Sequence, residues 1–136
     1  DNMPIDHIIS PEIELSQAVL RRLEIPGAFD VGSMCGDKVK IIGVKCTERC
    51  PILGSPIRYL ADLFDDLKMS IIAILRDNEV IVPRDGSVKM MEGDEVYFVC
   101  EDTHLSRAMT SFGHEEPESR RILIAGGGNI ATWMWI

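Results

Sequence analysis

Short apolar segments separated by tight turns fill residues 69–100, and this pattern most narrows the choice of fold. Met69–Leu75 is almost entirely apolar, which predicts a central strand buried on both faces of a sheet. Asp77-Asn78 favours the positive φ angles of a two-residue hairpin turn. Val80–Val82 is therefore expected to return as the partner strand, and Pro83 to end it.

Two more turns, at 84–87 and 92–94, precede further expected strands at 88–91 and 95–100. Strands joined by tight turns pair with their neighbours in the chain, and they do so in the antiparallel sense. The predicted fold class is therefore α+β, with a small mixed or antiparallel sheet and flanking helices.

Three helices are expected around this sheet. Ser10-Pro11 is a typical helix start and Pro26-Gly27 a typical stop, so a helix is predicted between them. Its apolar stripe packs either on the core of its own domain or against a second subunit, and the sequence leaves both open. The stripe consists of Ile13, Leu15, Ala18, Val19, Leu20 and Leu23. The other two helices are predicted at 57–68 and at 103–112, where Gly113 is the expected stop.

Two further segments complete this reading of the chain. The β-rich run 39–44 predicts a strand with one buried face. Residues 114–120 are charged, contain a proline and show no apolar period, which predicts a linker. The expected order is helix, strand, helix, three or four short strands, helix.

A glycine-rich turn follows an apolar segment near the end of the sequence. In a dinucleotide-binding fold, Gly126 would allow the tight turn, Gly128 the close approach of a pyrophosphate, and Ala131 the packing of the next helix. The acidic residue that holds the ribose is expected about 20 residues further on, whereas the sequence ends at Ile136. We therefore expect an incomplete lobe at 121–136 in a piece of a longer, repeated protein. An ordinary strand-to-helix turn is the alternative.

Composition excludes several classes of function. Lysine and arginine number 14 against 22 aspartates and glutamates, for a net charge of -8. The basic residues form no run, so nucleic acid is not an expected partner. No apolar run approaches the roughly 18 residues of a membrane span, and residues 1–6 do not resemble a signal peptide. A soluble cytosolic protein with reduced thiols is expected.

Catalytic and metal chemistry find little support in the sequence. The histidines lie beside no recognisable nucleophile, so the chain is not expected to be an enzyme. A Cys₃His zinc site is conceivable if two strand ends meet, with the ligands Cys46, Cys50, Cys100 and His104. The three residues between Cys46 and Cys50 include no glycine, unlike a typical zinc knuckle. Partly buried free cysteines and no metal are the preferred reading.

The expected hairpin also offers a candidate ligand pocket. Arg76, Asn78 and Pro83 bracket strands that contain Ile74 and Ile81, which places a guanidinium and an amide beside an apolar wall. Such a surface suits a small anionic ligand or a second subunit. The alternative, which we favour, is that Arg76 pairs with a carboxylate such as Glu79 or Asp94.

Taken together, several segments resemble the TrkA family, the peripheral regulatory subunits of Trk potassium-uptake systems. The resemblance rests on an ordered set of short segments that spans nearly the whole chain. They are Pro4–Glu12, Pro26–Ala28, Ile72–Arg76, Ile81–Pro83, Glu92–Val96 and Ile124–Ile130. The part from the hairpin to Glu95 resembles the C-terminal domain of RCK (regulator of potassium conductance) proteins.

The resemblance implies a domain organisation. Residues 1–30 would be the end of a Rossmann lobe with its crossover helix, 31–113 the RCK C-terminal domain, 114–120 a linker, and 121–136 the start of a second nucleotide-binding lobe. The intact parent would bind NAD(H) or ATP, partly through residues matching Gly126, Gly128, Asn129 and Ala131, whereas the incomplete lobe would bind neither tightly. Residues 132–136 match the expected helix poorly.

The resemblance also implies function and partners. The chain would be a cytoplasmic, regulatory module, peripheral to the inner membrane, that dimerises through the small domain and the crossover helix. It would transmit nucleotide-dependent gating to a membrane potassium-translocating subunit. The alternative is a sensor of a cyclic dinucleotide, because some relatives bind one at residues matching Arg76, Asn78, Ile81 and Pro83.

Overall fold

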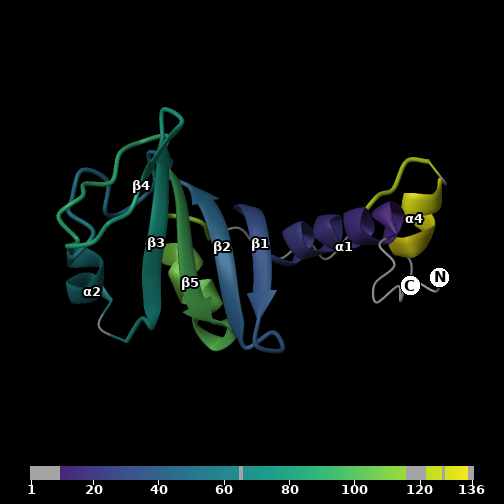
Figure 1. The fold of residues 1–136 in the computed structure, drawn as a ribbon, viewed down its shortest axis with the longest axis horizontal. Helices are drawn as coiled ribbons and strands as arrows, with labels where there is room; N and C mark the ends of the chain where they lie inside the picture. The colour runs from purple at the N-terminus through teal and green to yellow at the C-terminus, as the bar shows by residue number, and fades with distance from the viewer. Residues whose placement is uncertain (1–9, 65, 116–121, 127, 135–136) are drawn as a thin grey trace, which may run out of the picture.

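The computed structural model describes residues 10–64, 66–115, 122–126 and 128–134. Five antiparallel strands form one sheet in the order β1-β2-β5-β3-β4 (Figure 1). The strands are β1 (Ala28–Met34), β2 (Val39–Lys45), β3 (Met69–Arg76), β4 (Glu79–Ile81) and β5 (Glu95–Glu101). The helices are α1 (Pro11–Glu24), α2 (Tyr59–Leu63), the 3₁₀ turn η1 (Asp102–His104), α3 (Leu105–Ser111) and α4 (Asn129–Met134). The expected α+β class with a small antiparallel sheet is confirmed.

The core lies on one face of the sheet. β2 and β5 pair without interruption, so Ile42 lies opposite Phe98 and Val44 opposite Val96, and all four side chains are buried. Phe112, just beyond α3, stacks on Phe98 with 5.1 Å between the ring centroids. The long connections from β2 to α2 and from β4 to β5, together with α2 itself, add further buried side chains to this core, namely Cys46, Cys50, Ile52, Leu60 and Met90.

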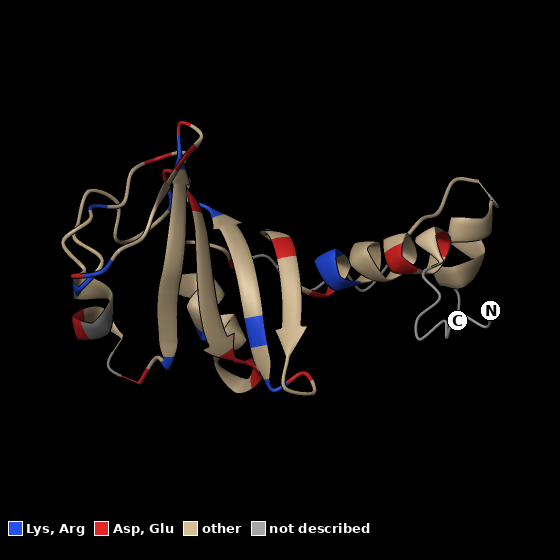
Figure 2. Cartoon of the chain, viewed as in Figure 1, with Lys and Arg blue, Asp and Glu red and all other residues tan. Residues whose placement is uncertain are grey.

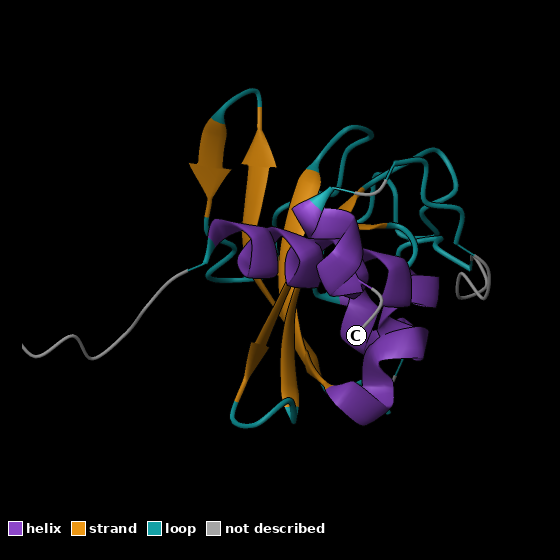
Figure 3. Cartoon of the chain, turned by 90° about the vertical axis from the view of Figure 1, so that its right-hand side faces the viewer, coloured by secondary structure: helices purple, strands orange, loops and turns teal. Residues whose placement is uncertain are grey.

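The opposite face of the sheet is not covered by any described helix. In Figure 1 α3 lies behind the strands, and in Figure 3, turned by 90°, most of the loops lie to the right of the strands. The uncovered residues alternate with the core residues along β2, β3 and β5, so they point away from the core. We call the following residues the open sheet face: Phe29, Ile41, Ala73, Leu75, Tyr97 and Val99. All six are partly exposed.

Phe29 and Tyr97 organise the open sheet face. Their rings meet edge to face with 5.6 Å between the centroids. The ring of Phe29 lies over Gly43 of β2, where a Cβ atom would stand 2.8 Å from it. Gly43 is therefore required for this approach, since any side chain would displace the aromatic ring.

Strand β1 was not expected from the sequence. It forms a hairpin with β2, and Cys35, Gly36 and Asp37 in the connecting turn all have positive φ angles. The pairing gives β1 its strand conformation even though Gly32 and Ser33 have low strand propensity. The sheet is consequently one strand wider at this edge than predicted.

Three other expectations require correction. β3 is not buried on both faces, because Ile72 is 41% exposed on a sheet that lacks a second layer. Residues 88–91 form no strand; Met90 and Lys89 make isolated bridges to the loop before α2. That loop occupies residues 46–58 and forms turns closed by its own backbone hydrogen bonds. The helix expected at 57–68 is therefore reduced to Tyr59–Leu63.

The hairpin turn agrees with the sequence analysis. Asp77 and Asn78 have φ angles of 49° and 65°, as the predicted two-residue turn requires. Charged residues lie mainly in turns and at strand ends, and the middle of β3 and β5 has none (Figure 2). Among the described residues, no helix has the length and apolar character needed to cross a membrane.

The segments before and after the sheet domain meet at Gly27 and His114. Gly27 precedes β1 and has φ +87°, and a Cβ atom there would stand 2.6 Å from Nδ1 of His114. His114 follows α3, is buried, and its Nε2 lies 3.0 Å from the carbonyl oxygen of Lys45. The segment before the sheet and the segment after it therefore meet against the end of β2.

Candidate functional site

The β3–β4 hairpin positions the candidate ligand residues. Arg76 is the last residue of β3 and lies two residues after Ile74, so its side chain leaves the sheet on the core face. Asp94 immediately precedes β5, which pairs with β3. The turn before Asp94 contains Gly93 at φ +88°, and it brings the carboxylate under the guanidinium.

Arg76 and Asp94 form a bidentate ion pair. Arg76 donates from Nε to Oδ1 of Asp94 over 2.7 Å and from Nη2 to Oδ2 over 2.8 Å. Nη2 also donates to the carbonyl oxygen of Lys89 over 2.8 Å, while the amide of Met91 donates to Oδ2 of Asp94 over 2.9 Å. This cluster ties the 89–94 loop to the end of β3. We call these four residues the Arg76 clamp.

The electrostatics of the clamp favour the charged pair. The Asp94 side chain is 1% exposed and the Arg76 side chain 27%. Burial alone would raise the pKa of the Asp94 carboxyl, but the hydrogen bonds and the charge of Arg76 outweigh it, so this pKa lies below its ordinary value. The hydrogen bond that Arg76 donates to Asp94 also raises the pKa of Arg76. Of the two carboxylates considered from the sequence, Asp94 is the partner that the structure records.

The other three hairpin residues are distributed around this clamp. Asn78 is exposed in the turn, Ile81 lies opposite Ile74 and packs against the core, and Pro83 is partly buried just beyond β4. The fold thus places a guanidinium, an amide and an apolar residue on one hairpin. Because the guanidinium already binds Asp94 and Lys89, its role toward a ligand stays a prediction.

The glycine-rich turn does not have the expected surroundings. Residues 122–126 form no strand, and Leu123 is 95% exposed. A strand requires a neighbour, and in the described part of the chain no other strand lies beside this segment. Gly126 has φ +112°, Gly128 precedes α4, and Asn129 is exposed. Arg121 and Gly127 lie outside the described residues.

Helix α4 packs against α1 instead of against a Rossmann sheet. It spans six residues, Asn129–Met134, with Ala131 partly buried and Trp133 43% exposed. Among the described residues, the glycine-rich turn is therefore followed by a short helix that packs on α1.

The structure rules out the four-ligand zinc arrangement. Cys46 lies at the end of β5 where Asp94 is, because its amide donates to the carbonyl oxygen of Asp94 over 2.8 Å. Cys100 lies at the opposite end of the same strand, next to η1. Within the described residues no group of three or more potential ligands comes together. Cys46 and Cys50, however, are in direct contact, with their Sγ atoms 3.7 Å apart.

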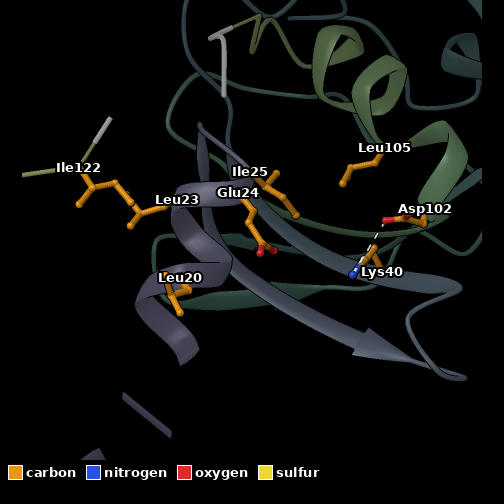
Figure 4. Close-up of a pocket in the computed structure, with 8 residues that line it drawn as sticks. All are labelled: Leu20, Leu23, Glu24, Ile25, Lys40, Asp102, Leu105 and Ile122. Atoms are coloured by element: carbon orange, nitrogen blue, oxygen red, sulfur yellow. Dashed lines mark ion pairs between the residues drawn. The ribbon is translucent and has the colours of Figure 1, made fainter. Parts of the chain in front are cut away.

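A cavity of about 410 Å³ lies between α1 and the start of α3 (Figure 4). Ile25 and Leu105 contribute apolar walls, and Lys40 with Asp102 forms an ion pair of 3.9 Å at one side. A neighbouring cavity of about 310 Å³ shares Glu24, Ile25 and Leu105. Sequence reasoning missed this groove, and the only signal for it was the apolar stripe of the first helix.

Comparison with known families identifies the fold. Residues 41–113 match the TrkA-C domain family, and this range begins within β2 and contains β3, β4, β5 and α3. The chain belongs to the TrkA-C domain family. The resemblance to TrkA proteins stated from the sequence is thereby confirmed.

Curated relatives extend this similarity beyond the TrkA-C domain. The Trk system potassium uptake protein TrkA of Azorhizobium caulinodans is 45% identical over 134 residues, which is 98% of this chain and 29% of that protein. The protein of the same name from Vibrio alginolyticus is 33% identical over 130 residues, or 96% of this chain and 28% of that protein. The chain thus spans less than a third of the length of these relatives.

Two further matches are solved structures. The C domain of the KtrA regulator of potassium conductance, in complex with cyclic diadenosine monophosphate, is 27% identical, with 70% of this chain and 96% of that chain covered and a TM-score of 0.46. The GsuK channel bound to NAD is 18% identical, with 91% and 22% covered and a TM-score of 0.47.

Proposed function

We propose that this chain is a regulatory module of a potassium-uptake subunit and acts through contacts with other subunits, without catalysis of its own. The observation that carries this proposal is the match of residues 41–113 to the TrkA-C domain family, extended over 98% of the chain by a TrkA protein at 45% identity. By this proposal residues 31–113 form the regulatory domain, residues 1–30 contain the preceding crossover helix, and residues 121–136 begin a second nucleotide-binding lobe. The intact protein would be cytoplasmic and bind peripherally to its membrane partner.

The open sheet face is the proposed surface for a second copy. Its six residues are apolar apart from the Tyr97 hydroxyl, and all are only partly buried within one chain. Ile72, next to them on β3, is 41% exposed. Burial of such a face in a dimer would remove this apolar surface from water. Leu15 of α1 is 49% exposed and would extend the interface to the crossover helix.

Light scattering with matched variants tests the proposed dimer. Ile72→Lys places a charge beside the open sheet face, whereas Leu63→Lys makes the same charge change on α2, where Leu63 is 61% exposed. We expect a dimer for the original chain and for Leu63→Lys, and a monomer for Ile72→Lys. A monomer for the original chain at high concentration would contradict the dimer, as would a dimer that both variants leave intact.

Nucleotide control is proposed for the intact parent protein. NAD(H) or ATP bound to the complete lobes would shift their arrangement, and the TrkA-C dimer would transmit that shift to a membrane potassium-translocating subunit. The exposed Leu123 and the short α4 support the expectation that this chain alone holds no nucleotide tightly.

A chimera tests the transport role. In the TrkA protein of Azorhizobium caulinodans, the 134 matching residues would be replaced by those of this chain, and potassium uptake would be measured in a strain without its own TrkA. We expect uptake well above that of the deletion strain. A chimera that is as abundant as the native protein but leaves uptake at the deletion level would overturn the proposal.

A cyclic-dinucleotide sensor is the second candidate. It is favoured by the exposed Asn78 amide in the hairpin turn beside Arg76, whose side chain keeps 27% exposure. Titration calorimetry with cyclic diadenosine monophosphate would give a Kd below about 1 μM for a sensor. Asn78→Gly, which removes the amide and keeps the positive φ of the turn, would then weaken binding without loss of stability. Heat signals absent up to millimolar ligand would remove this candidate and leave the transport role untouched.

A further inference from the structure

Cys46 and Cys50 form a contact that the proposed regulatory role does not use. Their Sγ atoms are 3.7 Å apart, and the Cys46 thiol donates to the Cys50 sulfur. The side chains are nearly closed off from solvent, with 1% and 4% of each residue exposed. Two sulfur atoms at this distance are near van der Waals contact and need to approach by roughly 1.7 Å to reach the length of a disulfide bond, about 2.05 Å.

The surrounding backbone holds the two cysteines in one turn. The amide of Cys50 donates to the carbonyl oxygen of Thr47 over 3.0 Å, which closes the turn. Cys46 is fixed from the other side, because Gly93 donates to its carbonyl oxygen over 2.8 Å. The backbone of Arg49 and Cys50 also packs closely against Gly113 at the end of α3. The side-chain contact is therefore built into the fold.

The two thiols of the pair differ in their pKa values. The hydrogen bond from Cys46 lowers the pKa of the Cys50 thiol to about 7, against the effect of burial. The same hydrogen bond, together with burial, raises the pKa of Cys46. Cys50 is thus the thiol of the pair that ionises more readily, whereas burial raises the pKa of Cys100 to about 11.

A cavity borders the turn next to Cys50. A cavity of about 370 Å³ is lined by Arg49 and Pro51, the residues on either side of Cys50, together with Thr110, Gly113 and Glu115. Metal binding is a poor explanation for the pair, since a zinc site needs three or four protein ligands and within the described residues no third group joins the two thiols.

We propose that Cys46 and Cys50 are a dithiol oxidation site whose substrate is a small hydroperoxide. The Cys50 thiolate attacks the terminal oxygen of the peroxide, the O–O bond breaks, and water or an alcohol leaves once the released oxygen takes up a proton. Cys50 is then a sulfenic acid. The Cys46 sulfur attacks the Cys50 sulfur, the S–S bond forms, the S–O bond breaks, and the hydroxide leaves as water with the Cys46 proton. The two thiols lose two electrons and the peroxide gains them.

Oxidation at this site acts on the Arg76 clamp through the backbone. Cys46 exchanges hydrogen bonds with the 93–94 turn, and Asp94 in that turn holds Arg76. Formation of the disulfide draws Cys50 toward Cys46 and strains the backbone of the turn between them. This proposal concerns the thiols alone and does not depend on the potassium-transport role.

Peptide mapping after mild oxidation tests the proposal. The folded full chain with Cys35→Ser, which removes the exposed cysteine, would be treated with hydrogen peroxide, unfolded in the presence of an alkylating reagent, and digested with trypsin. Trypsin cleaves after Lys45, Arg49 and Arg58, so a Cys46–Cys50 disulfide joins two otherwise separate peptides, 46–49 and 50–58. We expect this joined species, and its loss after treatment with dithiothreitol.

Controls separate the site from general oxidation. Links to Cys100 should be at least about tenfold rarer in the folded chain, because Cys100 is rarely ionised, and this preference should vanish in urea. Cys46→Ser should leave a Cys50 sulfenic acid that dimedone traps, and Cys50→Ser should leave Cys46 unoxidised. The peroxide dose should be one that fully oxidises the exposed Cys35 of the original chain. If peptides 46–49 and 50–58 of the folded chain are then recovered separately, each alkylated, the proposal is overturned.

Discussion

Replacement of Asp94 by asparagine should destabilise the fold through the Arg76 clamp. The substitution keeps the size of the side chain but removes its charge, and it exchanges one acceptor oxygen for an NH₂ group. In place of Oδ1 that group would face Nε of Arg76, a donor at 2.7 Å. In place of Oδ2 it would face both Nη2 of Arg76 and the amide of Met91, donors at 2.8 and 2.9 Å. At least one hydrogen bond to the residue 94 side chain is therefore lost.

The expected loss in unfolding free energy is about 2–3 kcal/mol. Removal of one partner from a fully buried ion pair costs about 3–5 kcal/mol, because the other charge is left without compensation. Here Asp94 is 1% exposed but Arg76 is 27% exposed, so water partly solvates the remaining guanidinium and reduces the cost. A hydrogen bond to a charged group contributes about 1.5–3 kcal/mol, which agrees with the expected loss of about 2–3 kcal/mol.

The effect should depend on pH with a defined sign. The pKa of Asp94 is lower in the folded chain than its ordinary value, so the carboxylate stabilises the fold fully above the unfolded pKa of about 3.9. This contribution is lost as pH falls from there through the folded pKa. The difference in stability between the original chain and Asp94→Asn should therefore be constant near neutral pH and shrink below about pH 4.

Urea unfolding followed by circular dichroism measures these differences. Glu79→Gln is the matched control, since Glu79 lies opposite Arg76 in the β3–β4 register but is exposed, and its change should stay within about 0.5 kcal/mol. Arg76→Gln completes a double-mutant cycle with a coupling of at least about 1 kcal/mol. Additive losses, or a loss below about 0.5 kcal/mol for Asp94→Asn, would refute the argument for the clamp.

Three further predictions follow from the backbone and from the glycine-rich turn. Gly113→Ala should lower the free energy of unfolding by at least about 1 kcal/mol more than Gly93→Ala does. Both glycines have positive φ, but only at Gly113 would the Cβ meet backbone, 2.5 Å from the Arg49 oxygen. Thermal unfolding measures the difference, and equal losses would contradict this. Gly43→Ala should lower stability by about 1–3 kcal/mol and alter the near-UV dichroism of the aromatic rings, since its Cβ would stand 2.8 Å from Phe29. Calorimetry should detect no NAD binding tighter than about 1 mM to this chain, and a micromolar Kd would show that the turn works without a complete lobe.

The hairpin was predictable because its chemistry is local. Asp77 and Asn78 supply the turn themselves, so the strands on either side follow from neighbouring residues. β1 was not predictable in the same way, since Gly32 and Ser33 weaken its pattern and its conformation depends on pairing with β2. Tertiary pairing overrode local propensity at that edge.

The candidate site was predictable as a set of residues but not as a network. The sequence allowed either Glu79 or Asp94 as the partner of Arg76, and only the register of β3 with β5 decides between them. The zinc hypothesis failed for a related reason, because spacing along the chain cannot say that Cys46 and Cys100 lie at opposite ends of β5. The contact between Cys46 and Cys50 depends in turn on the hydrogen bonds of a single loop.

The meeting of Gly27 and His114 beside the end of β2 has a mechanical consequence. Because the chain enters and leaves the sheet domain beside the same end of β2, a displacement of either flanking segment at this point bears on the other through the contact between Gly27 and His114. Any side chain at position 27 would collide with the imidazole ring of His114 and force the two segments apart.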